Sequence, residues 1–177
     1  KLLLDRNNVL SAAQWCYKTI QKKTPTSSLT KKNREIAELL VQIGIQFGSV
    51  LWQRALWYDR LTLAHAALNA AELLSDWRSV STFARNISWI YFYQGDYLRA
   101  LRWAEEALSA TSKTEDKLLI AAAKRSLGTV EMRLGNFDRS ESLLMDVLKT
   151  SEEFPKDDYG IYSMGFAQYG LGDLEYE

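Results

Sequence analysis

The chain has 177 residues, of which 47% are hydrophobic and 25% are charged, so it can bury a core and is not expected to be disordered. Its 22 Lys and Arg residues balance 22 Asp and Glu residues, so net charge gives no reason to expect nucleic acid or an anionic membrane as the main partner. No apolar run reaches the roughly 18 residues of a membrane span. The single Cys16 excludes an intramolecular disulfide framework and agrees with a reducing, cytoplasmic compartment.

Apolar residues recur at spacings of three and four along almost the whole chain, which predicts an all-α protein of about eight helices. The polar segment 21–32 is long for a connection between short helical repeats, which suggests an insertion. We expect the first three helices at residues 3–20, 33–56 and 58–74.

Glycines and capping residues mark the ends of the later helices. Aspartate, asparagine and serine accept hydrogen bonds from the first backbone N–H groups of a helix, and glycine tolerates the left-handed conformation that ends one. We expect Ser75-Asp76 to cap a helix over 77–93 and Gly95-Asp96 to cap one over 97–111. A capping box of Ser112 and Glu115 is expected to start a helix to Leu134, and Gly135-Asn136 a helix to about 154. Asp157 or Asp158 is expected to cap an eighth helix to Leu171.

The chain repeats itself every 40 residues. Similar residues recur at this interval: Ala67-Leu68, Ala107-Leu108 and Val147-Leu148; Trp57, Tyr97 and Phe137; and Gly95-Asp96 with Gly135-Asn136. The small residues Gly48, Ser88 and Gly128 keep the same interval, and we expect them to let helix axes approach closely. A period of 20–50 residues predicts stacked supersecondary units, here antiparallel helical hairpins.

With the turn glycine at the fifteenth position, residues 81–108 resemble a tetratricopeptide repeat. The matching positions are Ile87, Ser88, Tyr91, Gly95, Tyr97, Ala100 and Ala107, then Leu127, Gly128, Gly135, Phe137 and Val147, and finally Met164, Gly165, Gly172 and Leu174. Ala84, Lys124, Glu131 and Ser140 depart from the pattern, because larger or more apolar residues would be expected there. The resemblance implies a right-handed α-solenoid over 33–177, with hairpins at about 41–74, 78–112, 116–153 and 158–177 after an N-terminal helix and loop at 1–32.

A second resemblance concerns residues 5–16, DRNNVLSAAQWC. This segment is similar to the asparagine-leucine-alanine-alanine-tryptophan segment of regulatory ATPases of the NB-ARC (STAND) type, and residues 57–77 resemble the opening hairpin of their repeat arrays. The resemblance implies a sensor region of a signal-transduction ATPase. Because the chain begins at Lys1 and stops just after a predicted helix start, we expect a fragment of a longer protein. No phosphate-binding loop is present in it.

The tetratricopeptide resemblance also implies a concave groove lined by the first helix of each hairpin. Aromatic residues and arginines often anchor protein interfaces, and Arg85 and Arg125 would stack 40 residues apart to receive a carboxylate. We therefore expect a protein-interaction or ligand-sensing module that binds a protein or peptide of acidic character. The expected partner-binding residues are Trp52, Arg85, Trp89, Phe92, Tyr93, Arg125, Met132, Arg133, Tyr162 and Phe166.

The alternative is a scaffold without a ligand, whose terminal repeats pack on neighbouring domains or on copies of the chain. A groove would leave Trp89, Phe92 and Tyr93 facing solvent, whereas a scaffold would bury them. No enzyme, cofactor or metal site is expected, because His65 and Cys16 are far apart in the sequence and adjacent carboxylates on a helix point in different directions. The lysine pairs at 22–23 and 31–32 lack the interleaved aromatics of single-strand binders.

Overall fold

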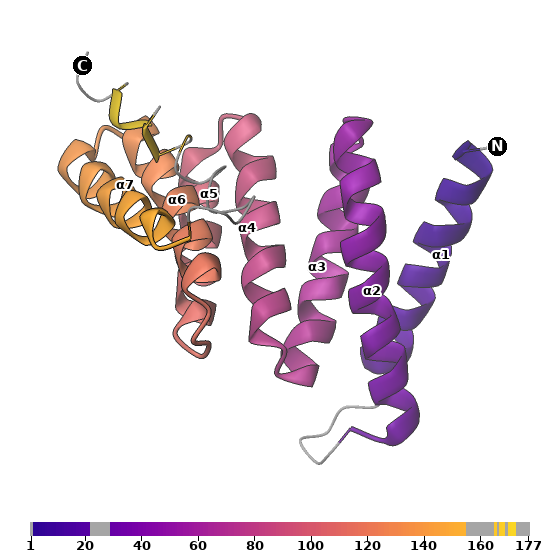
Figure 1. Cartoon of the computed structure of the whole chain (residues 1–177). Helices are drawn as coiled ribbons and strands as arrows, with labels where there is room; N and C mark the ends of the chain where they lie inside the picture. The colour runs from indigo at the N-terminus through magenta and orange to yellow at the C-terminus, as the bar shows by residue number, and fades with distance from the viewer. Residues whose placement is uncertain (1, 22–28, 155–164, 166, 169, 173–177) are drawn as a thin grey trace. The chain divides into compact units, whose positions relative to one another are not determined.

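The computed structural model describes residues 2–21, 29–154, 165, 167–168 and 170–172, and this part of the chain is helical without strands (Figure 1). The expected all-α class is confirmed. The caps predicted at Asp157 or Asp158 lie outside the described residues, whereas the described residues of the predicted eighth helix, at 165, 167–168 and 170–171, are helical. The helices are α1 (Leu2–Gln21), α2 (Lys31–Gln53), α3 (Trp57–Leu74), α4 (Trp77–Tyr93), α5 (Tyr97–Thr111), α6 (Lys117–Arg133) and α7 (Phe137–Glu152).

The bounds of α4 and α5 agree with the predicted ones, and those of α2 differ at both ends. The Thr30 hydroxyl accepts a hydrogen bond from the Asn33 N–H at 3.2 Å, so α2 begins at Lys31. It ends at Gln53 instead of residue 56. The reason is Ala55, whose φ of 53° is left-handed and cannot continue a right-handed helix.

Ala55 belongs to a set of three left-handed residues that close equivalent turns. Gly95 and Gly135 have φ of 77° and 80°, and the three residues lie 40 apart in sequence. Asp96 then caps α5, as predicted, by accepting from the Arg99 N–H at 3.0 Å. The first turn therefore has the same geometry as the other two although it has no glycine.

The predicted capping box of Ser112 and Glu115 is wrong. Ser112 ends α5, where its N–H and its hydroxyl both donate to the Ser109 carbonyl. Helix α6 begins only at Lys117, and the Asp116 carboxylate caps it by accepting from the Leu119 N–H at 2.9 Å. A carboxylate at the helix start also interacts favourably with the helix dipole.

The described chain forms two compact units, residues 1–83 and 84–177, and each is treated by itself. The predicted division after residue 32 stays a prediction. In the first unit α1, α2 and α3 pack together around fully buried side chains such as Ile20, Leu40 and Leu51. In the second, α6 packs against both α5 and α7, and Ala121, Val147 and Ala167 form a buried cluster.

Serine hydroxyls tie the two helices of each hairpin together in the second unit. Ser88 on α4 donates to the Ala100 carbonyl on α5 at 2.8 Å, and Ser140 on α7 donates to the Gly128 carbonyl on α6 at 2.8 Å. Positions 88 and 128 are equivalent in the repeat, as are 100 and 140. The same contact is thus made with the serine on opposite helices, which explains the departure at Ser140.

In the first unit the glycine that lies in close contact with other residues is Gly44, and not Gly48 as predicted. A Cβ on Gly44 would lie 2.5 Å from the Ala67 Cβ and 2.8 Å from the Phe83 Cζ, whereas a Cβ on Gly48 would meet nothing within 4 Å. Phe83 is fully buried, so its ring has little room to move. Residue type identified the small positions, but only the packing distinguishes the crowded glycine from the uncrowded one.

These two glycines provide a matched test. Gly44→Ala is expected to lower the free energy of unfolding by about 1–3 kcal/mol, because the added methyl group overpacks a filled contact. Gly48→Ala, on the same helix, is expected to raise it by roughly 0.5–1 kcal/mol, because alanine loses less backbone entropy on folding. Urea denaturation followed by circular dichroism measures both, and equal effects would contradict the assigned contact.

The left-handed turns provide a second test. Ala55→Gly is expected to raise the free energy of unfolding by about 0.5–1 kcal/mol, because relief of left-handed strain exceeds the added entropy of the unfolded chain. Gly95→Ala, at the equivalent turn, is expected to lower the free energy of unfolding by about 1 kcal/mol, because it introduces a side chain at a left-handed residue. Thermal unfolding of the two single variants checks both signs, and a destabilising Ala55→Gly would show that this turn is not left-handed in solution.

Candidate functional site

Three aromatic side chains gather at the C-terminal end of α4. The ring centroids of Trp89 and Phe92 are 5.2 Å apart in an edge-to-face arrangement, and those of Phe92 and Tyr93 are 5.7 Å apart at 90°. Trp89 and Tyr93 lie 5.9 Å apart, and Phe92 also contacts Tyr97 at the start of α5 at 5.5 Å. We call Trp89, Phe92 and Tyr93 the α4 aromatic cluster.

The exposure of the α4 aromatic cluster is graded. Tyr93 is 60% exposed, whereas Trp89 and Phe92 are half-buried. Edge-to-face contacts of this kind hold neighbouring rings in place. The cluster therefore offers one accessible ring supported by two that pack beneath it, which matches neither the fully open groove nor the fully filled scaffold.

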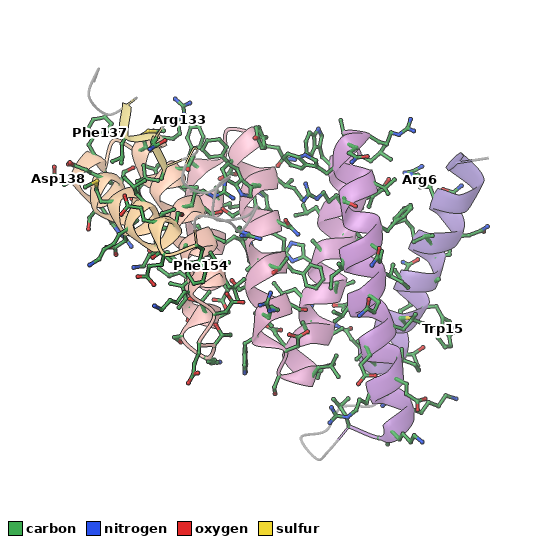
Figure 2. All side chains as sticks on the ribbon, viewed as in Figure 1. Arg6, Trp15, Arg133, Phe137, Asp138 and Phe154 are labelled. Carbon is green, nitrogen blue, oxygen red and sulfur yellow. The ribbon has the colours of Figure 1, made fainter. Side chains whose placement is uncertain are left out.

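The arginines expected beside the cluster differ in accessibility. Arg85, one turn before Trp89 on α4, is half-buried, and Arg133 at the end of α6 is exposed (Figure 2). Arg125 is only 5% exposed. The expected stacking of Arg85 and Arg125 as an open carboxylate site is therefore not available on this surface, because a ligand would reach Arg125 only after local opening. Met132 is half-buried.

Of the remaining predicted residues, the structure describes Trp52. Trp52 belongs to the first unit, where it contacts Trp57 edge-to-face at 5.0 Å and has the Arg60 guanidinium carbon 4.3 Å from its ring centroid. Burial lowers the pKa of Arg60 to about 10. Trp52 thus has a packing role next to a buried cation. Tyr162 and Phe166 lie outside the described residues.

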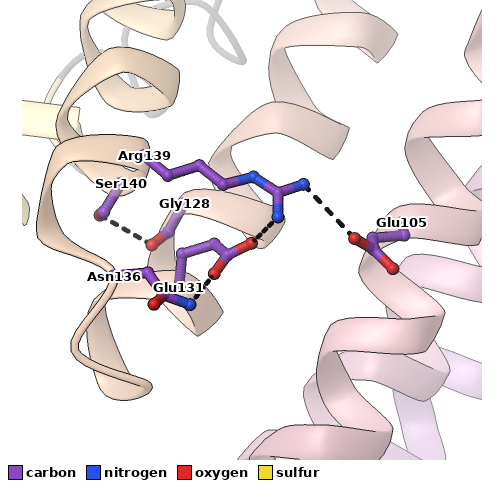
Figure 3. A network of polar contacts seen from close by, with 6 residues as sticks. All are labelled: Glu105, Gly128, Glu131, Asn136, Arg139 and Ser140. Atoms are coloured by element: carbon purple, nitrogen blue, oxygen red, sulfur yellow. Dashed lines mark hydrogen bonds and ion pairs between the residues drawn. The ribbon is translucent and has the colours of Figure 1, made fainter.

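A polar network in the second unit was not anticipated as such from the sequence (Figure 3). The Glu131 side chain is fully buried on α6, and its Oε1 lies 2.6 Å from Nη1 of Arg139 on α7. Asn136 donates from Nδ2 to Glu131 Oε2 at 2.6 Å. The other guanidinium nitrogen of Arg139 lies 3.3 Å from Glu105 on α5, so one arginine links three helices.

The repeat explains why this network arises at Glu131. The residues equivalent to Glu131 and Arg139, 40 earlier, are Tyr91 and Arg99, and the Arg99 guanidinium lies over the Tyr91 ring at 4.7 Å. An arginine of the second helix thus covers the same position of the first helix in both hairpins, by a cation–π contact in one and an ion pair in the other. The departure at Glu131 preserves the interaction with different chemistry.

The departure at Lys124 also has a partner. Lys124 Nζ lies 2.6 Å from Asp146 Oδ2 on α7, so this lysine joins the two helices of its hairpin. This position usually carries an apolar residue, and here its lysine forms an ion pair instead. Three of the four departures, at Lys124, Glu131 and Ser140, are polar contacts within the hairpin of α6 and α7.

A hollow that the sequence did not predict lies between α1 and α3 in the first unit. Its volume is about 770 Å³, and residues of both helices line it, among them His65. Burial lowers the pKa of His65, which favours the neutral imidazole. Within the described residues no group of three or more His, Cys, Asp or Glu side chains could hold a metal ion, and no described helix is long and apolar enough to cross a membrane.

Comparison with known families places the repeat at the centre of the chain. The family model described as tetratricopeptide repeat matches residues 81–114, which run from α4 through α5 and the turn after it. This match supports a repeat protein of the tetratricopeptide type. No curated protein matches the chain. Repeats of this family generally mediate interactions between proteins.

The Glu131 network makes a prediction about stability. Arg139→Ala is expected to lower the free energy of unfolding by roughly 2–3 kcal/mol, because it leaves the Glu131 carboxylate buried beside a single amide; half of Arg139 is exposed, which keeps the loss at the lower end of the range for broken buried pairs. Arg102→Ala, at an exposed position of α5, is the control and should change it by less than about 0.5 kcal/mol.

A double-mutant cycle separates the ion pair from other effects of Arg139. In a chain that already carries Glu131→Gln, Arg139→Ala should lower the free energy of unfolding by clearly less, because no buried charge is then left without its partner. Chemical denaturation of the four proteins gives the coupling energy. Additive effects would show that Arg139 and Glu131 do not interact in solution.

Proposed function

We propose that this chain is a non-catalytic, cytoplasmic interaction module that binds a protein or peptide of acidic character against the α4 aromatic cluster. Tyr93 is the accessible anchor, Trp89 and Phe92 hold it in place, and Arg85, one turn before Trp89 on α4, orients a carboxylate. The single observation that carries the proposal is the exposure of Tyr93 on top of two packed aromatic rings. Exposed tyrosines that are already ordered contribute contact area at low entropic cost.

Several of the other expected contact residues would add to this surface without being essential to it. Met132 and Arg133 would extend the contact along α6, and Arg125 would support the surface from below, where it is buried. Trp52, Tyr162 and Phe166 are expected contact residues that the minimal form of this proposal does not use. The minimal binding surface is therefore Arg85 with the α4 aromatic cluster.

The scaffold without a ligand stays the second candidate, because Trp89 and Phe92 are half-buried. In that role the terminal repeats would contact neighbouring domains or a second copy, and Tyr93 would contribute to packing alone. The two candidates differ in whether a short peptide, with no folded partner attached, is bound at Tyr93.

We also propose that the chain is the sensor part of a larger regulatory ATPase of the NB-ARC type. Residues 5–16, which carry that resemblance, lie on α1 directly before the repeats. Ligand capture would then shift the repeats between an inhibitory and a released arrangement. The open reading frame of the gene tests this, because the proposal requires a phosphate-binding loop upstream of residue 1.

The binding proposal is tested with displayed libraries of unstructured 12-residue peptides, one pool rich in Asp and Glu and the other in Lys and Arg. We expect enrichment from the acidic pool only. Tyr93→Ala should weaken the selected peptides about tenfold or more, as loss of an anchor does, and Arg85→Glu should abolish binding. Fluorescence anisotropy with the isolated peptides measures both effects.

Leu98→Ala is the matched control, because Leu98 is 74% exposed on α5, the second helix of the hairpin, outside the proposed surface. It should leave the dissociation constant unchanged. Circular dichroism confirms that each variant is folded. Failure to enrich any peptide, or an equal loss with Leu98→Ala, would favour the scaffold.

A further inference from the structure

The hollow between α1 and α3 lies in the first unit and has no part in the function proposed above. At about 770 Å³ it is large enough for a ligand or for a row of side chains. A second, smaller hollow of about 290 Å³ adjoins it and shares Tyr17 and Gln21 with it. We call the two together the α1–α3 groove.

Part of the residues that line this groove follow a regular helical spacing on each wall. On α1 they include positions 7, 11, 14, 18 and 21, and on α3 positions 58, 62, 65, 69 and 72. Both series alternate steps of four and three, so each forms one straight stripe along its helix. Fourteen residues of helix span about 21 Å, so the groove is as long as four helical turns.

The two walls run in the same direction. Arg6 pairs with Asp59 near the start of both helices, and Gln21 and Leu73 line the smaller hollow near the end of both. Helix α2 packs on α1 and α3 but lines neither hollow. Because three helices leave such a bundle open on one side, a fourth helix could pack there as α2 does on its own side, with its side chains between the two stripes.

The charges along the groove limit what kind of helix fits. Amide, hydroxyl and neutral imidazole groups dominate the walls, including Gln14, Thr62 and His65. Of the two charged residues that line the larger hollow, Asp59 is paired with Arg6, whereas no described carboxylate forms an ion pair with Lys18. Glu72 lines the smaller hollow and makes an interaction of its own. Lys18, near the C-terminal end of α1, is therefore the charged residue of the groove that no described carboxylate pairs with.

We propose that the α1–α3 groove binds one amphipathic helix of a partner protein, about four turns long and antiparallel to α1 and α3. Its groove-facing stripe is small and uncharged except for one acidic residue in its first turns, which meets Lys18. The antiparallel direction places the positive N-terminal end of the partner's dipole at the negative C-terminal ends of α1 and α3, and an acidic residue near a helix N-terminus is itself favourable.

The experiment uses a display library of 21-residue capped helical peptides and the complete chain. The groove-facing positions vary among Ala, Leu, Ser, Thr and Gln, and one position in the first turn is Glu in half of the library and Lys in the other half. We expect selected peptides to carry Glu, and to protect α1 and α3 from hydrogen exchange when bound. Lys18→Glu should shift the preference toward Lys by about three- to tenfold.

Two further variants separate the groove from general effects. Thr62→Trp and, independently, Ser11→Trp fill the groove from opposite walls and should each abolish binding, with circular dichroism as the check of folding. Lys32→Glu changes the same charge at an exposed position of α2 that does not line the groove, so it should leave peptide preference unchanged.

Three results would overturn the proposal. One is selected peptides that bind the groove-filled variants as well as the original chain. Another is an absence of any enriched helix. The third is a concentration-dependent dimer in analytical ultracentrifugation that Thr62→Trp dissociates, which would assign the groove to a second copy. Because the peptides differ in conformation from those that test the α4 aromatic cluster, each proposal can fail without the other.

Discussion

The contact between the two helices of each hairpin is the constraint on which the rest of this structure depends. A left-handed residue at positions 55, 95 and 135 reverses the chain, and a small residue or a serine then lets one helix lie against the backbone of the other. The serine hydroxyl satisfies a backbone carbonyl that a close approach would otherwise shield from water. Once this contact is made, the neighbouring side chains have little freedom in where they lie.

The polar departures from the repeat pattern are consequences of that constraint. With the helices held close together, an arginine on the second helix reaches the same position of the first helix in successive hairpins, and both Tyr91 and Glu131 provide a surface that accepts a guanidinium. A fully buried carboxylate is tolerated at Glu131 because Arg139 forms an ion pair with its Oε1 and Asn136 donates a hydrogen bond to its Oε2. Glu131 thus makes a buried polar contact within the second unit.

The two proposed binding surfaces differ in physical character. The α4 aromatic cluster projects one ordered ring into solvent and suits an extended ligand that covers it. The α1–α3 groove is concave and nearly neutral, and its two parallel walls suit a helix. A module with both would bind partners by different modes, each independent of the other.

The sequence by itself determined the all-α class, the bounds of α4 and α5 and the positions of the two glycine turns at 95 and 135, because these depend on local periodicity and on residues that tolerate or cap a chain reversal. It could not distinguish Gly44 from Gly48, or recognise that Arg125 is buried, because both depend on which side chains arrive from other helices. Spacing would have revealed the stripes on α1 and α3, but only tertiary structure decided that they face each other across a hollow. The local sequence specifies the helices and turns, whereas the accessibility of a side chain depends on how the helices pack.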